Sequence, residues 1–163
     1  MQIFGRDVPD AEALWQWYGS LATTPAIWRK DSLAASAKQC GFKRVSERKN
    51  GYFAFSLFEH ATGQAPVQGE LVEEIRLFIG QEPKDLAMDL WEKDHKKHAA
   101  LAKQYARRFQ DGLGAPRLAN GNSIFEANGL RVRVLAAECV WVVVSSLEVV
   151  RQMPEDYWKP TPP

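Results

Sequence analysis

A long amphipathic segment between Pro83 and Pro116 constrains the fold of this chain more than any other feature. Pro83 and Asp85 suit the first turn of a helix, whereas the Gly-Leu-Gly-Ala-Pro run that ends at Pro116 stops one. Between these ends, apolar residues recur at spacings of three and four: Leu86, Leu90, Trp91, Leu101, Tyr105 and Phe109. The pattern predicts one long helix with a single buried face, against which the rest of the chain packs.

Composition places the chain among ordinary globular proteins. It has 163 residues, of which 45% are hydrophobic and 25% charged, and its formal net charge is +1. This length predicts one domain at residues 1–152, followed by a proline-rich tail at residues 153–163. Because the charge is nearly balanced, we expect neither nucleic acid nor a membrane surface as a partner.

The two cysteines and the apolar runs indicate a compartment. Cys40 and Cys139 lie in apolar segments, as buried free thiols of a reducing compartment do. No segment approaches the roughly 18 consecutive apolar residues of a membrane span, and the first ten residues lack the apolar run of a secretory signal. We therefore expect a cytoplasmic protein.

The first half of the chain predicts two helices and then a hairpin. Helices are expected at residues 10–21, with Asp10 as the cap, and from Asp31 or Ser32 to Gly41. Strands at residues 42–48 and 52–59 flank an Asn-Gly turn. Residues 61–69, rich in Gly and Pro, are expected to form an exposed loop. Residues 70–79 fit both a helix and a strand, and their β-branched end favours the strand.

The second half predicts three more strands, at residues 123–127, 130–134 and 139–147, the first two around another Asn-Gly pair. The expected order is therefore α-α-β-β-β-α-β-β-β, in which a helix followed by a meander occurs twice. This order predicts an α+β fold with an antiparallel, twisted sheet of about six strands and helices packed on one face.

Catalytic motifs are absent from the sequence. His95 and His98 lie three residues apart with Glu92 before them, so a metal could in principle contact all three. The segment lacks the His-Glu-x-x-His pattern of zinc proteases, and packing beside the apolar stripe is the preferred interpretation. There is also no Gly-x-Ser-x-Gly elbow and no phosphate-binding loop. We predict no catalytic residue, no metal site and no cofactor.

The surplus of aromatic residues points to a binding surface. The chain has six tryptophans, and tryptophan and arginine are the residues that most often anchor protein interfaces. Three of them fit expected core faces: Trp15, Trp28 and Trp91. The other three tryptophans do not fit an expected core face. Two arginines also alternate with valines on the strand that precedes the one containing Trp141. The predicted partner-binding residues are Trp141, Arg131, Arg133, Trp17 and Trp158.

Three features of the sequence carry a resemblance to a known family: tryptophan-rich helices, the run Phe-Gln-Asp-Gly-Leu-Gly-Ala-Pro that ends at Pro116, and a meander with Gly-Leu-Arg-Val-Arg-Val starting at Gly129. Over most of its length the chain resembles the small cytoplasmic immunity proteins that bacteria keep beside secreted toxins. The resemblance implies an inhibitor that neutralises one cognate toxin by direct binding, and it assigns no individual functional residue.

Two alternatives to an immunity protein remain. The element order is also similar to that of type III secretion chaperones, which would make the chain a chaperone for an effector, although those proteins are usually acidic dimers and this chain is neutral. A small-ligand or metal-dependent enzyme built from scattered residues is the alternative from a different functional class.

Overall fold

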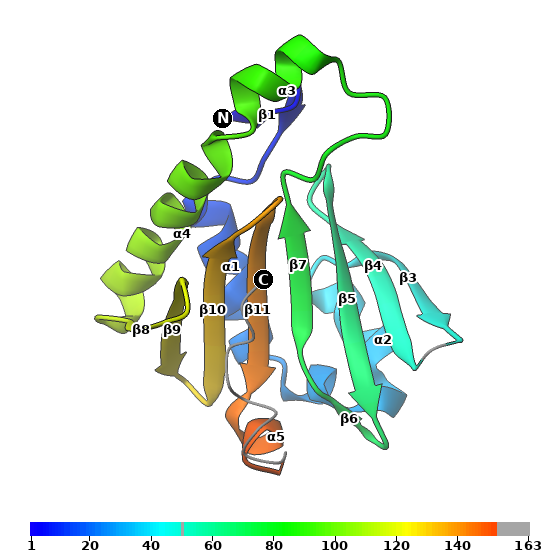
Figure 1. The fold of residues 1–163 in the computed structure, drawn as a ribbon. Coiled ribbons are helices and arrows are strands. Elements are labelled where there is room, and N and C mark those ends of the chain that lie inside the picture. The colour runs from blue at the N-terminus through cyan, green and yellow to red at the C-terminus, as the bar shows by residue number, and fades with distance from the viewer. Residues whose placement is uncertain (50, 153–163) are drawn as a thin grey trace.

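The computed structural model describes residues 1–49 and 51–152 (Figure 1). Its helices alternate with groups of antiparallel strands along the chain. The helical elements are α1 (Ala11–Ala22), the short 3-10 helix η1 (Pro25–Trp28), α2 (Lys30–Gln39), α3 (Met88–Asp94), α4 (Lys97–Leu113) and α5 (Leu147–Gln152). The prediction of an α+β fold is confirmed.

Nine strands form the main sheet, three more than the sequence predicts. They are β3 (Lys43–Arg48), β4 (Tyr52–Leu57), β5 (Ala61–Gln68), β6 (Leu71–Val72), β7 (Ile75–Ile79), β8 (Arg117–Ala119), β9 (Asn122–Ala127), β10 (Leu130–Ala136) and β11 (Val140–Ser146). The spatial order is β3-β4-β5-β7-β11-β10-β9-β8, with β6 paired to β5 alone, and all pairs are antiparallel. Two meanders therefore meet at β7 and β11. A separate hairpin joins β1 (Gln2–Ile3) to β2 (Arg6–Asp7).

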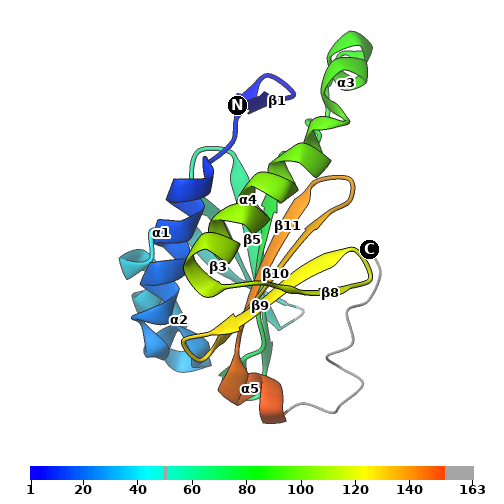
Figure 2. The ribbon, with the colours of Figure 1, turned by 90° about the vertical axis from the view of Figure 1, so that its left-hand side faces the viewer.

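Helices α1, α2 and α4 cover one face of the sheet, which we call the inner face (Figures 1 and 2). Alternate side chains of the central strands point to it because strand residues have a period of two. Leu77 of β7 and Val142 of β11 are directly opposite each other in the ladder, and both are fully buried. The core between helices and sheet is thus centred on the junction of the two meanders.

Helix α1 corrects one predicted site residue. As expected, Asp10 caps this helix: its Oδ1 accepts the backbone N–H of Ala13 at 2.7 Å. The buried stripe contains Trp17, which is 5% exposed, and its ring lies 6.2 Å from that of Phe42. Trp15 completes the three-and-four spacing equally well, so the spacing alone predicts that Trp17 lies outside the stripe. Trp17 is a core residue and offers no surface to a partner.

The single helix predicted from Pro83 is wrong in its start and its continuity. The helical segment begins at Met88 and is divided into α3 and α4 around His95. The carboxylate of Asp94, which is 2% exposed, lies at this division: Oδ2 accepts the backbone N–H of Phe4 at 2.7 Å, and Oδ1 pairs with Lys97 Nζ at 2.8 Å. The division thus anchors the N-terminal hairpin against the helical segment.

The N-terminal turn of this helical segment leaves one tryptophan outside the core. Trp91, predicted to be buried, is 37% exposed and stacks on His95 with their ring centroids 4.3 Å apart. The contact with Lys97 also affects the acidity of Asp94. Hydrogen bonding to Lys97 is the main cause of the lowered pKa of the Asp94 carboxyl.

The expected loop at residues 61–69 is instead strand β5, in the interior of the sheet. Glycine is needed here for packing: a Cβ at Gly63 would lie 2.3 Å from the ring of Phe55 and 2.5 Å from the carbonyl oxygen of Arg76. At Gly63, glycine therefore marks a close approach of neighbouring groups rather than a turn. The strand interpretation of residues 70–79 is confirmed by β6 and β7.

The two edges of the sheet are blunted in different ways. Edge strand β3 carries exposed charges, including Lys43 and Arg48, and its register shifts between Lys43 and Ser46. Within this bulge Arg44 has φ +54°, which is uncommon for a residue other than glycine. The opposite edge strand, β8, has three residues, and its Leu118 is 76% exposed. Charge, a bulge and short length are devices that limit pairing at sheet edges.

Replacing Gly63 with alanine tests the packing argument. We expect Gly63→Ala to lower the free energy of unfolding by about 1–3 kcal/mol, because the Phe55 ring and the Arg76 backbone must both shift. The measurement is urea denaturation followed by tryptophan fluorescence.

The matched control for that prediction is Gly19→Ala in helix α1, where nothing lies within 4 Å of the new Cβ. This change should be neutral or stabilising by up to about 1 kcal/mol, the helix preference for alanine over glycine. Equal midpoints for Gly63→Ala and the unaltered protein would contradict the packing argument.

Candidate interaction groove

The face of the sheet opposite α1, α2 and α4, here the outer face, carries a row of side chains that crosses the strands. The ladder registers align Ser56 of β4, Thr62 of β5, Phe78 of β7, Trp141 of β11 and Leu135 of β10. Phe78 and Trp141 are half-buried, and their rings meet edge to face with centroids 4.9 Å apart. An aromatic pair therefore lies where the two meanders join.

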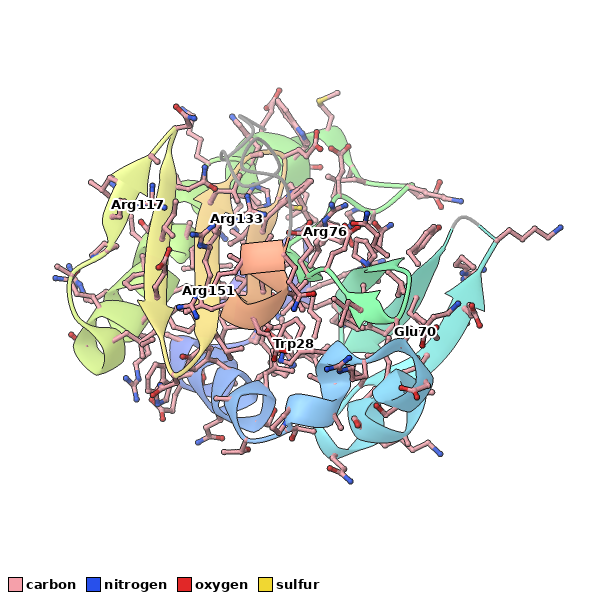
Figure 3. All side chains as sticks on the ribbon, turned by 90° about the horizontal axis from the view of Figure 1, so that it is seen from below. Trp28, Glu70, Arg76, Arg117, Arg133 and Arg151 are labelled. Carbon is pink, nitrogen blue, oxygen red and sulfur yellow. The ribbon has the colours of Figure 1, made fainter. Side chains whose placement is uncertain are left out.

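A second row on the outer face is built from charges. Glu74, whose side chain is 9% exposed, binds two arginines: Oε1 accepts from Arg76 Nε at 2.6 Å, and Oε2 from Arg133 Nη2 at 3.0 Å. In the ladders, both arginines pair with Val143, one from each side. The ion triad therefore crosses β11 at Val143, and Figure 3 shows the two arginines on the flanking strands.

The predicted residues Arg131, Arg133 and Trp141 thus share one face of the sheet. Both arginines are engaged with carboxylates, since Arg131 Nη2 lies 2.7 Å from Glu126 Oε1 and Arg133 binds Glu74. Their roles in partner binding stay predictions. The last predicted site residue, Trp158, lies outside the described residues.

The outer face is hollowed between β3 and β11, from the middle of β5 to the end at which β5 begins and β7 ends. Two depressions, of about 460 and 410 Å³, adjoin at Phe78 and Gln81, which line both of them. We call the two adjoining depressions the groove. Between them, the hydroxyl of Thr62 donates to Gln81 Oε1 at 2.6 Å. The main groove residues are Arg44, Arg48, Tyr52, Ser56, Thr62, Gln64, Phe78, Gln81, Glu82, Glu138 and Trp141.

Most of these groove residues were missed by the sequence analysis. The strand interpretation of residues 70–79 would have placed Phe78 opposite the core, beside Arg76, and this is the one available signal. Nothing in the sequence pairs β7 with β11, so the meeting of Phe78 with Trp141 required the structure.

The two histidines considered as metal ligands, His95 and His98, pack against neighbouring groups. His98 is 4% exposed, its Nε2 donates to the carbonyl oxygen of Gly80 at 2.6 Å, and its ring contacts Phe4 edge to face at 5.5 Å. His95 stacks on Trp91. In the described part of the chain, no group of three or more His, Cys, Asp and Glu side chains could hold a metal ion. Over the same residues, no helix has the length and apolarity needed to cross a membrane.

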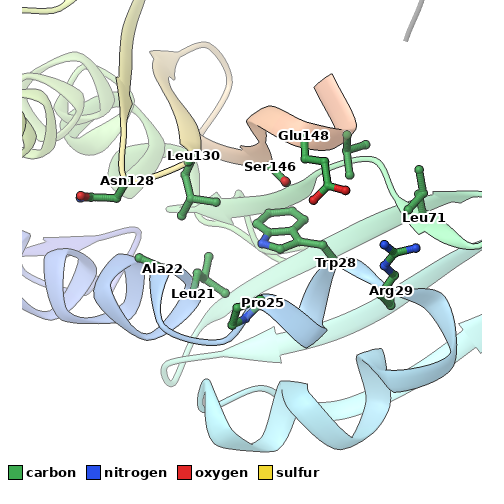
Figure 4. Close-up of a pocket in the computed structure, with 12 residues that line it drawn as sticks. Leu21, Ala22, Pro25, Trp28, Arg29, Leu71, Asn128, Leu130, Ser146 and Glu148 are labelled. Atoms are coloured by element: carbon green, nitrogen blue, oxygen red, sulfur yellow. The ribbon is translucent and has the colours of Figure 1, made fainter. Parts of the chain in front are cut away.

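A smaller pocket lies beside Trp28, between η1 and α5 (Figure 4). The carboxylate of Glu148 and the guanidinium of Arg29 lie on the same side of the indole, and Ser146 and Asn128 complete the polar lining. Its volume of about 150 Å³ is well below the roughly 300–1,000 Å³ of typical small-molecule sites. The groove on the outer face is therefore the stronger candidate site.

Cys139 lies at the acidic end of the groove, and its thiol is a poor nucleophile. Its side chain is 4% exposed. The pKa of the Cys139 thiol is raised to about 11, chiefly by burial and secondly by the nearby Glu138 carboxylate. Because the thiolate is the nucleophile, this cysteine is no candidate for covalent catalysis at neutral pH.

Replacing Glu74 with glutamine tests the ion triad. Glu74→Gln removes the charge that both Arg76 and Arg133 share, so we expect a loss of about 2 kcal/mol in the free energy of unfolding. Glu126→Gln is the matched control, because the Glu126 side chain is 43% exposed and its pair with Arg131 should contribute less than about 1 kcal/mol. If both variants unfold at the same urea concentration, the ion triad contributes no more to the free energy of unfolding than the exposed pair.

Alkylation of Cys139 tests its raised pKa. At pH 8 the native thiol should react with iodoacetamide at least about 100-fold more slowly than in 8 M urea, since a pKa two units higher reduces the thiolate population 100-fold. Its native rate should then rise with pH until about pH 11. Mass spectrometry of the peptide containing Cys139 gives both rates, and equal rates in the two conditions would refute the assignment.

Comparison with known proteins gives no match. No protein-family model fits the chain. No curated protein is similar to it in sequence, and no solved structure is similar to it in fold, at a significant level.

Proposed function

We propose that this chain is a protein-binding domain that neutralises a cognate toxin by direct contact through the groove on the outer face. The observation that carries the proposal is the groove itself, with half-buried Phe78 and Trp141 in its floor and unlike charges at its two ends. Aromatic side chains in a partly desolvated floor with a polar rim are typical of interface hot spots.

The shape of the groove favours a protein over a small molecule. It crosses several strands, whereas small-ligand sites enclose most of their ligand and converge polar groups on one point. Its polar side chains instead stand along the length of the groove, from Arg44 on β3 to Glu138 between β10 and β11. A partner that contacts both ends of the groove must reach from β3 to β11, which favours a polypeptide over a small molecule.

The resemblance to immunity proteins supports a toxin as the partner. Such inhibitors are small domains that block an active site or a conformational cycle of a single toxin. The nearly neutral net charge is compatible with this role, because a local surface of complementary charge, rather than the net charge of the whole chain, sets the specificity of binding.

Substitution of Thr62 tests the function. Thr62 is exposed in the middle of the groove, so Thr62→Arg should obstruct it while leaving the core intact. The tagged protein is used to purify its stoichiometric partner from its native cells, and the partner is then expressed with each variant. We expect the partner to be toxic alone, and Thr62→Arg to weaken binding at least about 10-fold and abolish protection.

The matched control is Gln104→Arg, on the exposed side of α4, which should bind and protect as the unaltered chain does. A stoichiometric partner that is harmless without this chain would replace the immunity role with a chaperone role. The absence of any stoichiometric partner would sink the proposal of protein binding.

A further inference from the structure

The groove has the length of a short extended peptide. It runs from β3 across β4, β5 and β7 to β11, which are consecutive neighbours in the sheet. At about 4.8 Å per strand, four spacings give about 19 Å. An extended chain covers that distance with about six residues at ~3.3 Å each.

The two ends of the groove carry opposite charges. Arg44 and Arg48 line it at β3, whereas Glu82 and Glu138 line it beside β11. All four residues are exposed, and none of them forms an ion pair with another described residue. The other outer-face charges described above, such as Glu74 and its arginines, are already paired. The groove ends therefore retain unused charge of opposite sign.

The backbone holds one of these charges in an unusual conformation. Arg44 lies in the β3 bulge with φ +54°, a region that costs a residue with a Cβ roughly 1 kcal/mol or more. The hydroxyl of Ser56, on the neighbouring strand, donates to the carbonyl oxygen of Lys43 at 3.2 Å beside this bulge. Bulges at sheet edges redirect side chains, and here the redirected side chain lines the groove.

The middle of the groove supplies apolar contact. Tyr52, Phe78 and Trp141 line successive parts of its length, and each is half-buried. Thr62, Gln64 and Gln81 stand between them with polar groups that suit a peptide backbone.

We propose that the partner occupies this groove with an extended segment of about six residues that is acidic at one end, apolar or aromatic in the middle and basic at the other end. The acidic end lies at Arg44 and Arg48, and the basic end lies at Glu82 and Glu138. This inference rests on the proposed function, and it adds the chemistry of the segment that is recognised.

The test is selection from a phage-displayed library of random octapeptides on the immobilised full chain. We expect enriched peptides to carry Asp or Glu and Lys or Arg at opposite ends, with an aromatic or aliphatic residue between them. With Arg44→Glu/Arg48→Glu, the same selection should yield peptides that are basic at both ends, because both ends of the groove are then acidic.

The matched control is Lys103→Glu/Arg107→Glu on the exposed surface of α4, which changes the net charge equally and should select the same peptides as the unaltered chain. In fluorescence anisotropy, the most enriched peptide should bind Arg44→Glu/Arg48→Glu at least about 10-fold more weakly than the control, with the difference shrinking in high salt.

Two results would overturn the inference: no enrichment at all, or identical enriched peptides with and without the charge reversal. Failure of the proposed function is distinguishable from this. If Thr62→Arg still abolishes capture of a stoichiometric toxic partner, the groove is the binding site and the extended segment alone is wrong. If no stoichiometric partner is captured, both proposals fail.

Discussion

The pairing of β7 with β11 is the interaction on which the rest of the structure depends. Each meander alone would end in a strand with an unpaired edge. The antiparallel ladder between β7 and β11, centred on Leu77 and Val142, pairs these two edges with each other. On the inner face this ladder completes the core under α1 and α4. On the outer face it places Phe78 against Trp141 and sets Arg76 across Val143 from Arg133. The core and the groove are therefore two faces of the same junction.

The local parts of the fold could be predicted from the sequence. Asp10 as a cap, the Asn-Gly turn before Leu130 and the alternating valines of β11 each depend on residues close in the chain. The errors arose where tertiary packing decides between equal local patterns. Gly63 reads as a loop residue until the ring of Phe55 is seen to occupy the space of its Cβ. The spacing on α1 likewise fits two stripes, and packing against Phe42 accompanies the one that buries Trp17. The spacing on α3 predicts a buried Trp91, which the structure instead leaves 37% exposed.

The candidate site was predictable in part. Alternation along β10 and β11 is enough to place Arg131, Arg133 and Trp141 on one face. The remaining wall of the groove comes from β3, β4, β5 and β7, and its position beside Trp141 depends on a pairing between distant segments. The orientation of Arg44 depends further on a bulge whose register no sequence pattern indicates.

The blunted edges have a consequence for how copies of this chain behave at high concentration. A sheet whose two outermost strands offered long rows of free N–H and C=O groups would join edge to edge with its neighbours into fibres. Here a free strand meets the charges and the bulge of β3 on one side, and the three residues of β8 on the other. Sheet extension is thus disfavoured in both directions, and recognition is left to the face of the sheet, where side chains rather than backbone groups select what binds.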